Sequence, residues 1–204
     1  MTQSANFITL AAPACTLRCC GIWPGTSTPE FFGFAFVIAC RDEHGIWAIR
    51  IEDAVIGPEL TKEQALERLA DMLPIAPVFI GWELGRMTVE PLLDLARDLD
   101  EPMRYHLTAR LARAMRGLVV DMAHNQGDTA PVARGSGLQP IGSVPAELVS
   151  DQRHRDLTSG VKLKVRRALR DEALAIWRYW LLSAPAGVEG ALAATQALMS
   201  GDAA

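Results

Sequence analysis

The chain has 204 residues, of which 50% are hydrophobic and 22% are charged, with a formal net charge of −4 at pH 7. A chain of this length can bury a sizeable core in one domain without disulfides or metal. No uninterrupted apolar run approaches the ~18–20 residues of a membrane-spanning helix, and no basic region precedes the first apolar residues, so we expect a soluble cytoplasmic protein.

Charge is divided unevenly along the chain. Residues 1–100 hold 7 basic and 14 acidic side chains, and residues 101–204 hold 13 basic and 10 acidic ones, so the two halves carry −7 and +3. Residues 153–170 contain only one acid, Asp156, among their many basic side chains. The basic residues are Arg153, Arg155, Lys162, Lys164, Arg166, Arg167 and Arg170. Such a patch can contact phosphates even on an acidic protein, although a solvated helix face is an equally good interpretation.

The four cysteines do not predict a metal site. Cys15, Cys19 and Cys20 form a Cys-x3-Cys-Cys pattern, and Cys40 follows alone. A second Cys or His pair at zinc-site spacing is missing. We therefore expect reduced structural thiols.

The N-terminal quarter predicts three strands. Residues 7–13 are uncharged and predict a short buried strand, and residues 14–30 contain four Gly or Pro breakers and predict a loop or an irregular strand. Residues 31–40 and 45–52 flank a polar turn and predict an antiparallel hairpin.

A helix is predicted to begin at Thr61, because Gln64 follows three residues later as in a capping box. Its apolar face is predicted by the spacing of four residues, which are Leu66, Leu69, Ala70 and Leu73.

Two further strands are predicted at 77–82 and 117–123. Between them, Thr88 can cap a helix whose Pro91 is tolerated in its first turn, and a second helix is predicted over 102–116. The resulting order is three strands, a helix, a strand, helices and a strand.

The last third predicts an irregular loop over about 124–150, a long helix over 162–183 and a weaker helix over 185–200. No internal repeat or domain boundary is visible, so we expect a single domain over 1–204. A mixed sheet with helices on its faces is the expected α/β architecture.

The long helix has an apolar stripe at helical spacing, which consists of Leu169, Ala173, Ile176, Trp177 and Trp180. Asp171 lies on a different stripe, where a carboxylate can sit at the rim of a cleft. The alternative is a surface pair with Arg167, four residues earlier.

The order of elements resembles the ribonuclease H-like fold of the 3′–5′ exonuclease superfamily, whose members place four acidic residues in three motifs (the DEDD type) around two metal ions. The resemblance implies three antiparallel strands followed by parallel strands, with helices on both faces. In the subfamily related to the exonuclease domain of family B DNA polymerases, the last motif has an aspartate followed by an apolar helix. The segment from Arg167 to Glu172, with Asp171 as the acid, is similar.

The middle motif of that subfamily is similar to the segment from Ile80 to Leu93 in its strand, tryptophan and following proline helix. The family's aspartate falls at Thr88 or Val89, and Glu90 can substitute for it after a slip of one residue. Asp121 resembles the acid that the family places on the next strand.

The first motif departs from the family. Family members begin with Asp-Ile-Glu-Thr, whereas Ile8 and Leu10 occupy the expected strand here, and neither can bind a hard cation. The family's general base falls at Arg166 or Arg167, and an arginine stays protonated and cannot accept a proton from water. Arginine can, however, contact a phosphate bidentately.

The resemblance leads to three functional hypotheses. The first is a catalytically degenerate exonuclease-like protein that binds single-stranded DNA or RNA, or scaffolds a nucleic-acid-processing complex, without a cofactor. The second is an active Mg²⁺- or Mn²⁺-dependent exonuclease with a rearranged site. Its carboxylates would come from Asp42 or Glu43, Glu83 or Glu90, Asp121 and Asp171, with Asp171 as a metal ligand.

The third hypothesis is a protein–protein module or homo-oligomer, with no membrane contact. Trp177, Tyr179 and Trp180 are candidate anchors for a partner, although we expect at least two of them to be core residues. The apolar residues Ile8 and Leu10 favour the first and third hypotheses over the second.

Overall fold

The computed structural model describes residues 13–22, 30–123, 159–183 and 188–200. In these residues a five-stranded sheet has the strand order β3-β2-β1-β4-β5. The strands are β1 (Ala14–Ile22), β2 (Glu30–Arg41), β3 (Trp47–Val55), β4 (Val78–Gly81) and β5 (Leu118–Asp121). The first three strands pair antiparallel, and β4 and β5 run parallel to β1. The predicted α/β sheet of three antiparallel strands followed by parallel ones is confirmed.

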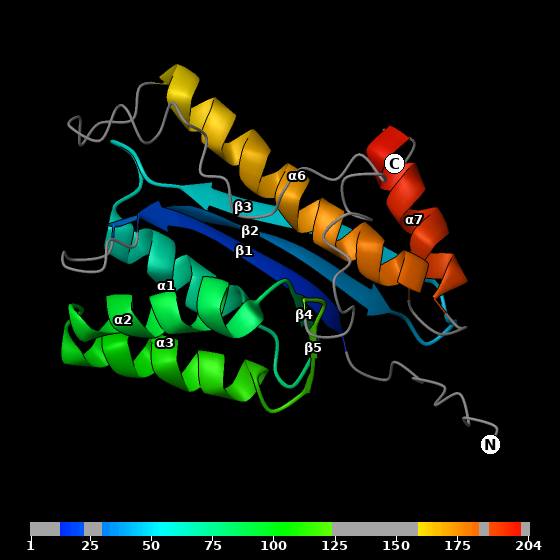
Figure 1. Ribbon diagram of the computed structural model, residues 1–204, viewed down its shortest axis with the longest axis horizontal. Helices are drawn as coiled ribbons and strands as arrows, with labels where there is room; N and C mark the ends of the chain where they lie inside the picture. The colour runs from blue at the N-terminus through cyan, green and yellow to red at the C-terminus, as the bar shows by residue number, and fades with distance from the viewer. Residues whose placement is uncertain (1–12, 23–29, 124–158, 184–187, 201–204) are drawn as a thin grey trace.

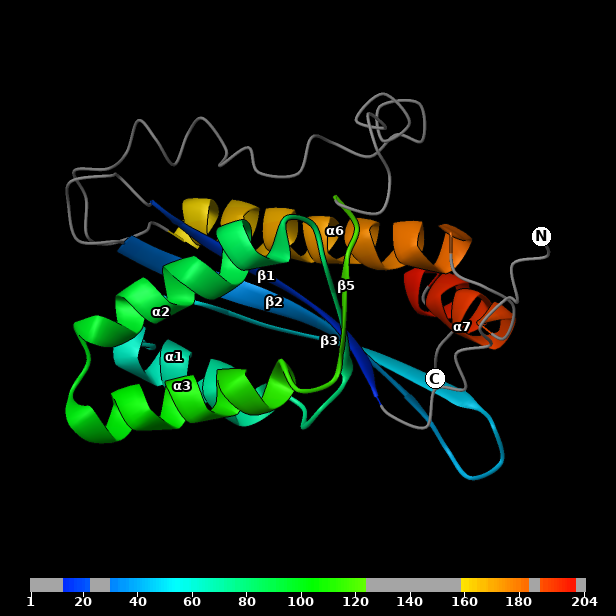
Figure 2. The same cartoon turned by 60° about the horizontal axis from the view of Figure 1, so that its bottom comes forward.

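Helices cover both faces of the sheet (Figures 1 and 2). One layer holds α1 (Lys62–Met72), the π-helical turn η1 (Gly85–Val89), α2 (Glu90–Arg97) and α3 (Glu101–Ala114). The opposite layer holds α6 (Ser159–Ser183) and α7 (Glu189–Ser200). The long α6 crosses β1, β2 and β3, and α7 packs on β3 and on α6.

The hairpin of β2 and β3 is the one the sequence predicts. Its turn is held by Asp42, whose Oδ1 accepts hydrogen bonds from the N–H of His44 at 2.9 Å and of Ile46 at 2.7 Å. Gly45 has a φ of 81°, a left-handed conformation that glycine adopts at little cost. These two local features fix the register between β2 and β3.

The predicted start of α1 is confirmed, and the predicted cap of α2 is wrong. Thr61 and Gln64 form the reciprocal capping box, with the Gln64 N–H donating to Thr61 Oγ1 at 3.2 Å. Thr88, in contrast, is buried inside η1, and Val89, the residue before α2, makes no side-chain cap. The chain already has helical dihedral angles before α2 begins, so no exposed N-terminus remains there for a threonine to cap.

The first described strand agrees with one of the two alternatives predicted for residues 14–30, an irregular strand, while the strand predicted at 7–13 is not tested. Within the described residues the strand is β1, at Ala14–Ile22, where a loop or an irregular strand was predicted, and residues 7–12 lie outside the described part. The Gly and Pro breakers that suggested a loop begin only at Gly21, where the register with β2 shifts. Because β1 pairs with β2 on one side and β4 on the other, its backbone hydrogen bonds are satisfied in the middle of the sheet.

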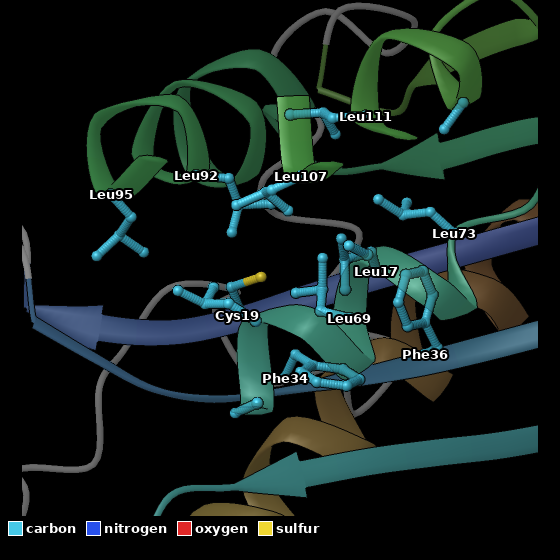
Figure 3. Packing of buried hydrophobic residues seen from close by; sticks show 14 of the residues in the cluster. Leu17, Cys19, Phe34, Phe36, Leu69, Leu73, Leu92, Leu95, Leu107 and Leu111 are labelled. Carbon is cyan, nitrogen blue, oxygen red and sulfur yellow. The ribbon is translucent and has the colours of Figure 1, made fainter. Parts of the chain in front are cut away.

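The core under α1, α2 and α3 is assembled from aliphatic and aromatic side chains (Figure 3). Leu17 of β1 and Leu69 of α1 are buried in it, and so is Leu107 of α3. Phe34 and Phe36 of β2 pack edge to face, with ring centroids 5.7 Å apart. This layer takes the odd-numbered side chains of β1, as expected from the alternation of a strand.

The core under α6 contains the predicted apolar stripe. All five of its residues, Leu169, Ala173, Ile176, Trp177 and Trp180, are buried. Tyr179 is also buried, so the three aromatic residues considered as partner anchors belong to the core. Trp177 donates its Nε1–H to Thr195 Oγ1 at 2.9 Å, which ties α6 to α7.

The predicted irregular loop at 124–150 lies outside the described residues. Among the described helices, none combines the length and the apolar composition that a bilayer crossing requires.

Candidate functional site

A buried ion pair lies at the centre of the sheet, where β1 meets α6. Arg18 of β1 is 4% exposed, and its Nε donates to Glu172 Oε2 of α6 at 2.6 Å. Thr16, two residues earlier on the same side of β1, is buried, and no residue in the described part accepts or donates a hydrogen bond at its Oγ1. The α6-facing positions of the first strand therefore hold Thr16 and Arg18, and β1 contains no carboxylate.

This observation changes the basis of the first-motif argument. Ile8 and Leu10, the residues aligned with the family's two carboxylates, lie outside the described residues and outside β1. The strand at the centre of the sheet, β1, also contains no acid, and on the face toward α6 it presents the cation Arg18 instead. Glu172, and not Asp171, is the carboxylate of α6 that reaches this strand.

The carboxylate of Asp121, at the end of β5, is bound by backbone N–H groups. It accepts hydrogen bonds from the backbone N–H of Glu83 at 2.9 Å, Leu84 at 2.8 Å and Ala123 at 3.1 Å. Glu83 follows β4 and has a φ of 46°, a strained conformation for a residue with a side chain. Asp121 thus holds the bend that leads from β4 into η1.

The other two candidate catalytic acids are exposed. The side chain of Asp171 is 70% exposed, with its Oδ2 3.9 Å from Arg167 Nε, and Glu90 is exposed at the start of α2. In the part of the chain that the structure covers, no three His, Cys, Asp or Glu side chains gather closely enough to hold a metal ion. The structure therefore does not bring Asp171, Asp121 and Glu90 together as a ligand set.

The basic face of α6 borders a groove of about 550 Å³ between α6, α7 and β3, which we call the α6–α7 groove. Three basic residues of α6, Arg166, Arg167 and Arg170, line it together with Asp171. The rest of the lining is aliphatic, and consists of Ile51, Leu163, Leu174, Leu198 and Met199. Asp171 therefore does sit at the rim of a cleft, and its pairing with Arg167 is present at the same time.

Two of the groove arginines share one carboxylate on the sheet. Asp53 of β3 is 11% exposed, with Oδ1 2.7 Å from Arg166 Nε and Oδ2 3.6 Å from Arg170 Nε. The Arg166 contact is an ion pair by distance, but the Nε–H is not aligned for a hydrogen bond with any residue in the described part. The attraction is therefore mainly between charges, which leaves the orientation of the guanidinium groups less constrained than a bidentate pair does.

The remaining basic candidates are spread more widely. Lys162 and Lys164 lie in the first turns of α6, where Lys164 is exposed and Lys162 is partly exposed. Arg153 and Arg155 lie outside the described residues. Of the described residues in the predicted basic patch, the three arginines Arg166, Arg167 and Arg170 line the groove.

Two of the described cysteines, Cys15 and Cys19, are buried as structural thiols are, whereas Cys40 is exposed. Cys15, Cys19 and Cys40 form no disulfide, and the first two are buried in the core. Burial raises the pKa of the Cys15 thiol well above its usual range, and Cys40 adds to the shift. Cys15 therefore stays protonated and unreactive at neutral pH.

Comparison with known proteins adds no family assignment. No protein-family model matches the chain, and no curated protein is similar enough to count as a match.

Two residues of the site escaped the sequence analysis, Arg18 and Asp53. Each is a lone charge on a buried strand face, which also holds Ala14 and Thr16 in the first case and Ile51 and Val55 in the second. A charge at a core-facing strand position is the signal that could have found them, since such a charge needs a partner. The partner itself lies on α6, more than 100 residues away.

Proposed function

We propose that this protein is a non-catalytic, ribonuclease H-like domain that binds nucleic acid through the α6–α7 groove. The observation that carries the proposal is the presence of three arginines along one groove with an aliphatic lining. Guanidinium groups suit phosphate oxygens, and an apolar lining suits the sugar and base of an unpaired nucleotide.

The local balance of charge supports an anionic ligand. Arg166, Arg167 and Arg170 face two carboxylates, Asp53 and Asp171, and Lys162 and Lys164 add two further cations on the same helix. The chain as a whole carries −4, so the groove is a cationic feature on an acidic protein. Such a contrast favours a specific anionic ligand over general adhesion to polyanions.

Two features support the non-catalytic part of the proposal. The strand at the centre of the sheet has Arg18 paired to Glu172 where an exonuclease of the resembled family needs carboxylates. Asp121 uses its oxygens to hold the backbone after β4. The strand order β3-β2-β1-β4-β5 supports the ribonuclease H-like architecture.

Arg167 gives the cleanest test, because its side chain is 86% exposed and its loss should leave the fold intact. We expect the wild type to bind a fluorescently labelled single strand, with an affinity that falls steeply with salt because counterions are released. Arg167→Gln should weaken binding about three- to fivefold and reduce the salt slope by about 0.7. Fluorescence anisotropy over a range of salt concentrations measures both.

Arg178→Gln is the matched control, since Arg178 is exposed on the same helix and does not line the groove. Equal weakening by both variants would mean that general charge, and not the groove, binds the strand. Absence of binding at low salt would refute the proposal.

The alternative of an active nuclease is tested by incubating the protein with a 5′-labelled strand and Mn²⁺ or Mg²⁺ and resolving the products on a gel. A ladder of shorter products that disappears with chelator and in Asp171→Asn would establish a metal-dependent exonuclease and refute the non-catalytic assignment.

A protein partner is the second candidate, and exposed apolar side chains favour it. Leu163 is 62% exposed and Met199 is 52% exposed at opposite walls of the groove. If the purified protein forms a stable oligomer and binds no strand at low salt, this function replaces the first. Sedimentation velocity is the measurement that decides between them.

A further inference from the structure

Asp53 has an unusual position relative to the groove arginines. It lies on β3 beneath α6, it is mostly buried, and it does not line the groove itself. Arg166 and Arg170 contact it from the groove side, and their side chains remain 41% and 44% exposed. Each arginine is therefore held on its inner side by Asp53 and is open to solvent on its outer side.

The two arginines lie four residues apart, so they occupy adjacent turns on the same face of α6. Both contact Asp53 through Nε, the nitrogen nearest the backbone. A guanidinium group approached at Nε still has four N–H donors on its two terminal nitrogens. Two such groups, whose inner ends are both held near one carboxylate by charge attraction, are suited to contact one tetrahedral anion together.

We propose that Asp53 is a positioning residue that holds Arg166 and Arg170 as a clamp for a single phosphate group in the α6–α7 groove. This inference rests on the proposed function, which it deepens by assigning the phosphate to two of the three arginines. The aliphatic lining of the groove places an apolar moiety next to that phosphate. A backbone phosphate of a single strand and the phosphate of a free nucleotide both have this chemistry.

The clamp makes a prediction opposite to that of a diffuse basic surface. Asp53→Asn removes one negative charge beside the groove, and for a diffuse surface this would strengthen the binding of any polyanion. For a clamp, the same change frees two long side chains that must then be ordered by the ligand, which weakens binding. The sign of the change in affinity therefore separates the two.

The experiment compares Asp53→Asn with Glu52→Gln. Both substitutions change the net charge from −4 to −3, and the two residues are adjacent on β3 but point to opposite faces of the sheet. Glu52 contacts Arg68, at 3.5 Å, and lines a separate groove. We expect Asp53→Asn to weaken binding of the labelled single strand about fivefold and to reduce the salt slope by about 0.7, the value for one phosphate contact. Glu52→Gln should change the affinity less than twofold.

A second probe, adenosine 5′-monophosphate followed by isothermal titration calorimetry, distinguishes the two sources of phosphate. If the wild type binds the strand and Asp53→Asn binds it as tightly or more tightly, the clamp is wrong and the proposed function stands. If the wild type binds only the nucleotide, the proposed function is wrong, and weakening of nucleotide binding by Asp53→Asn supports the clamp. If the wild type binds neither probe, both proposals are refuted.

Unfolding of the variants in urea provides the control for fold integrity. A merely structural role of Asp53 would lower the midpoint of unfolding and leave the salt slope of the folded protein unchanged. A reduced slope in a variant that remains folded at the assay temperature supports the positioning role.

Discussion

The two faces of the central sheet are built from different chemistry. The face under α1, α2 and α3 is closed by leucine and phenylalanine side chains (Figure 3), and the strand charge Glu52 meets Arg68 of α1 at 3.5 Å in a solvent-exposed pair at its edge. The face under α6 is also mainly apolar, but Arg18 and Asp53 project from its strands and meet Glu172, Arg166 and Arg170 of the helix.

This difference supports the location of the proposed binding site. Apolar packing stabilises a fold because it removes apolar surface from water. A buried ion pair gains little net stability over apolar residues of similar volume, because both charges lose their hydration. The stability of the fold therefore does not explain why charged residues are buried under α6. They are better explained by the groove that the same helix borders, because arginines held near one carboxylate lose less side-chain freedom when they bind an anion.

The largest effect is expected from breaking the central ion pair. Glu172→Ala leaves the Arg18 guanidinium buried without its counter-charge, and we expect a loss of about 4 kcal/mol in the free energy of unfolding. Equilibrium unfolding in urea measures this loss. The double variant Arg18→Met with Glu172→Leu removes both charges and should recover most of it. A double variant as unstable as the single one would show that the pair itself, and not the orphaned charge, stabilises the fold.

A smaller loss is expected on the opposite face, from Leu69→Ala. Leu69 is fully buried among β1, β2 and α3 residues, and truncation creates a cavity that costs about 3 kcal/mol. Urea unfolding is again the measurement, with Leu93→Ala as the control, because Leu93 is exposed on α2. We expect strand binding by the folded variant to stay unchanged, since the cavity lies across the sheet from the α6–α7 groove. Weaker binding by the folded variant would contradict the separation of the two faces.

The two faces also differ in how far the sequence predicts them. The elements of the α1–α3 face carry local signals, such as the capping box of Thr61 and Gln64, and nearly all were located correctly. The exception is Thr88, where a π-helical turn replaces the expected cap. Apolar spacing alone also predicted the buried stripe of α6, because a helix of that length must bury one side.

Predicting the site from the sequence would require knowing which charged residues pair across long distances along the chain. The sequence after Arg18 is interrupted by Gly and Pro, and although a charge in an apolar strand indicates that a partner is needed, it does not indicate that the partner is Glu172. Asp53 likewise signals a missing partner but does not identify Arg166 and Arg170. The basic residues of α6 were identified from composition, but which of them line a groove depends on α7 and β3. Long-range charge pairing is thus the part of the site that a single sequence leaves undetermined.

The smallest effect is expected from the polar link between α6 and α7. Trp177 donates to Thr195 Oγ1, and Thr195 donates in turn to the Ala191 carbonyl oxygen at 2.7 Å, all within the buried part of the interface. Thr195→Val keeps the shape of the side chain and removes the acceptor, so the indole N–H is left without a partner at a cost of about 1–2 kcal/mol. Thr195→Ser retains the hydroxyl and should lose less stability. Since α7 forms one wall of the α6–α7 groove, Thr195→Val should also weaken strand binding slightly, by less than threefold in fluorescence anisotropy. A loss of stability as large as that of Glu172→Ala would mean that this hydrogen bond contributes as much to the stability of the α6 face as the central ion pair does.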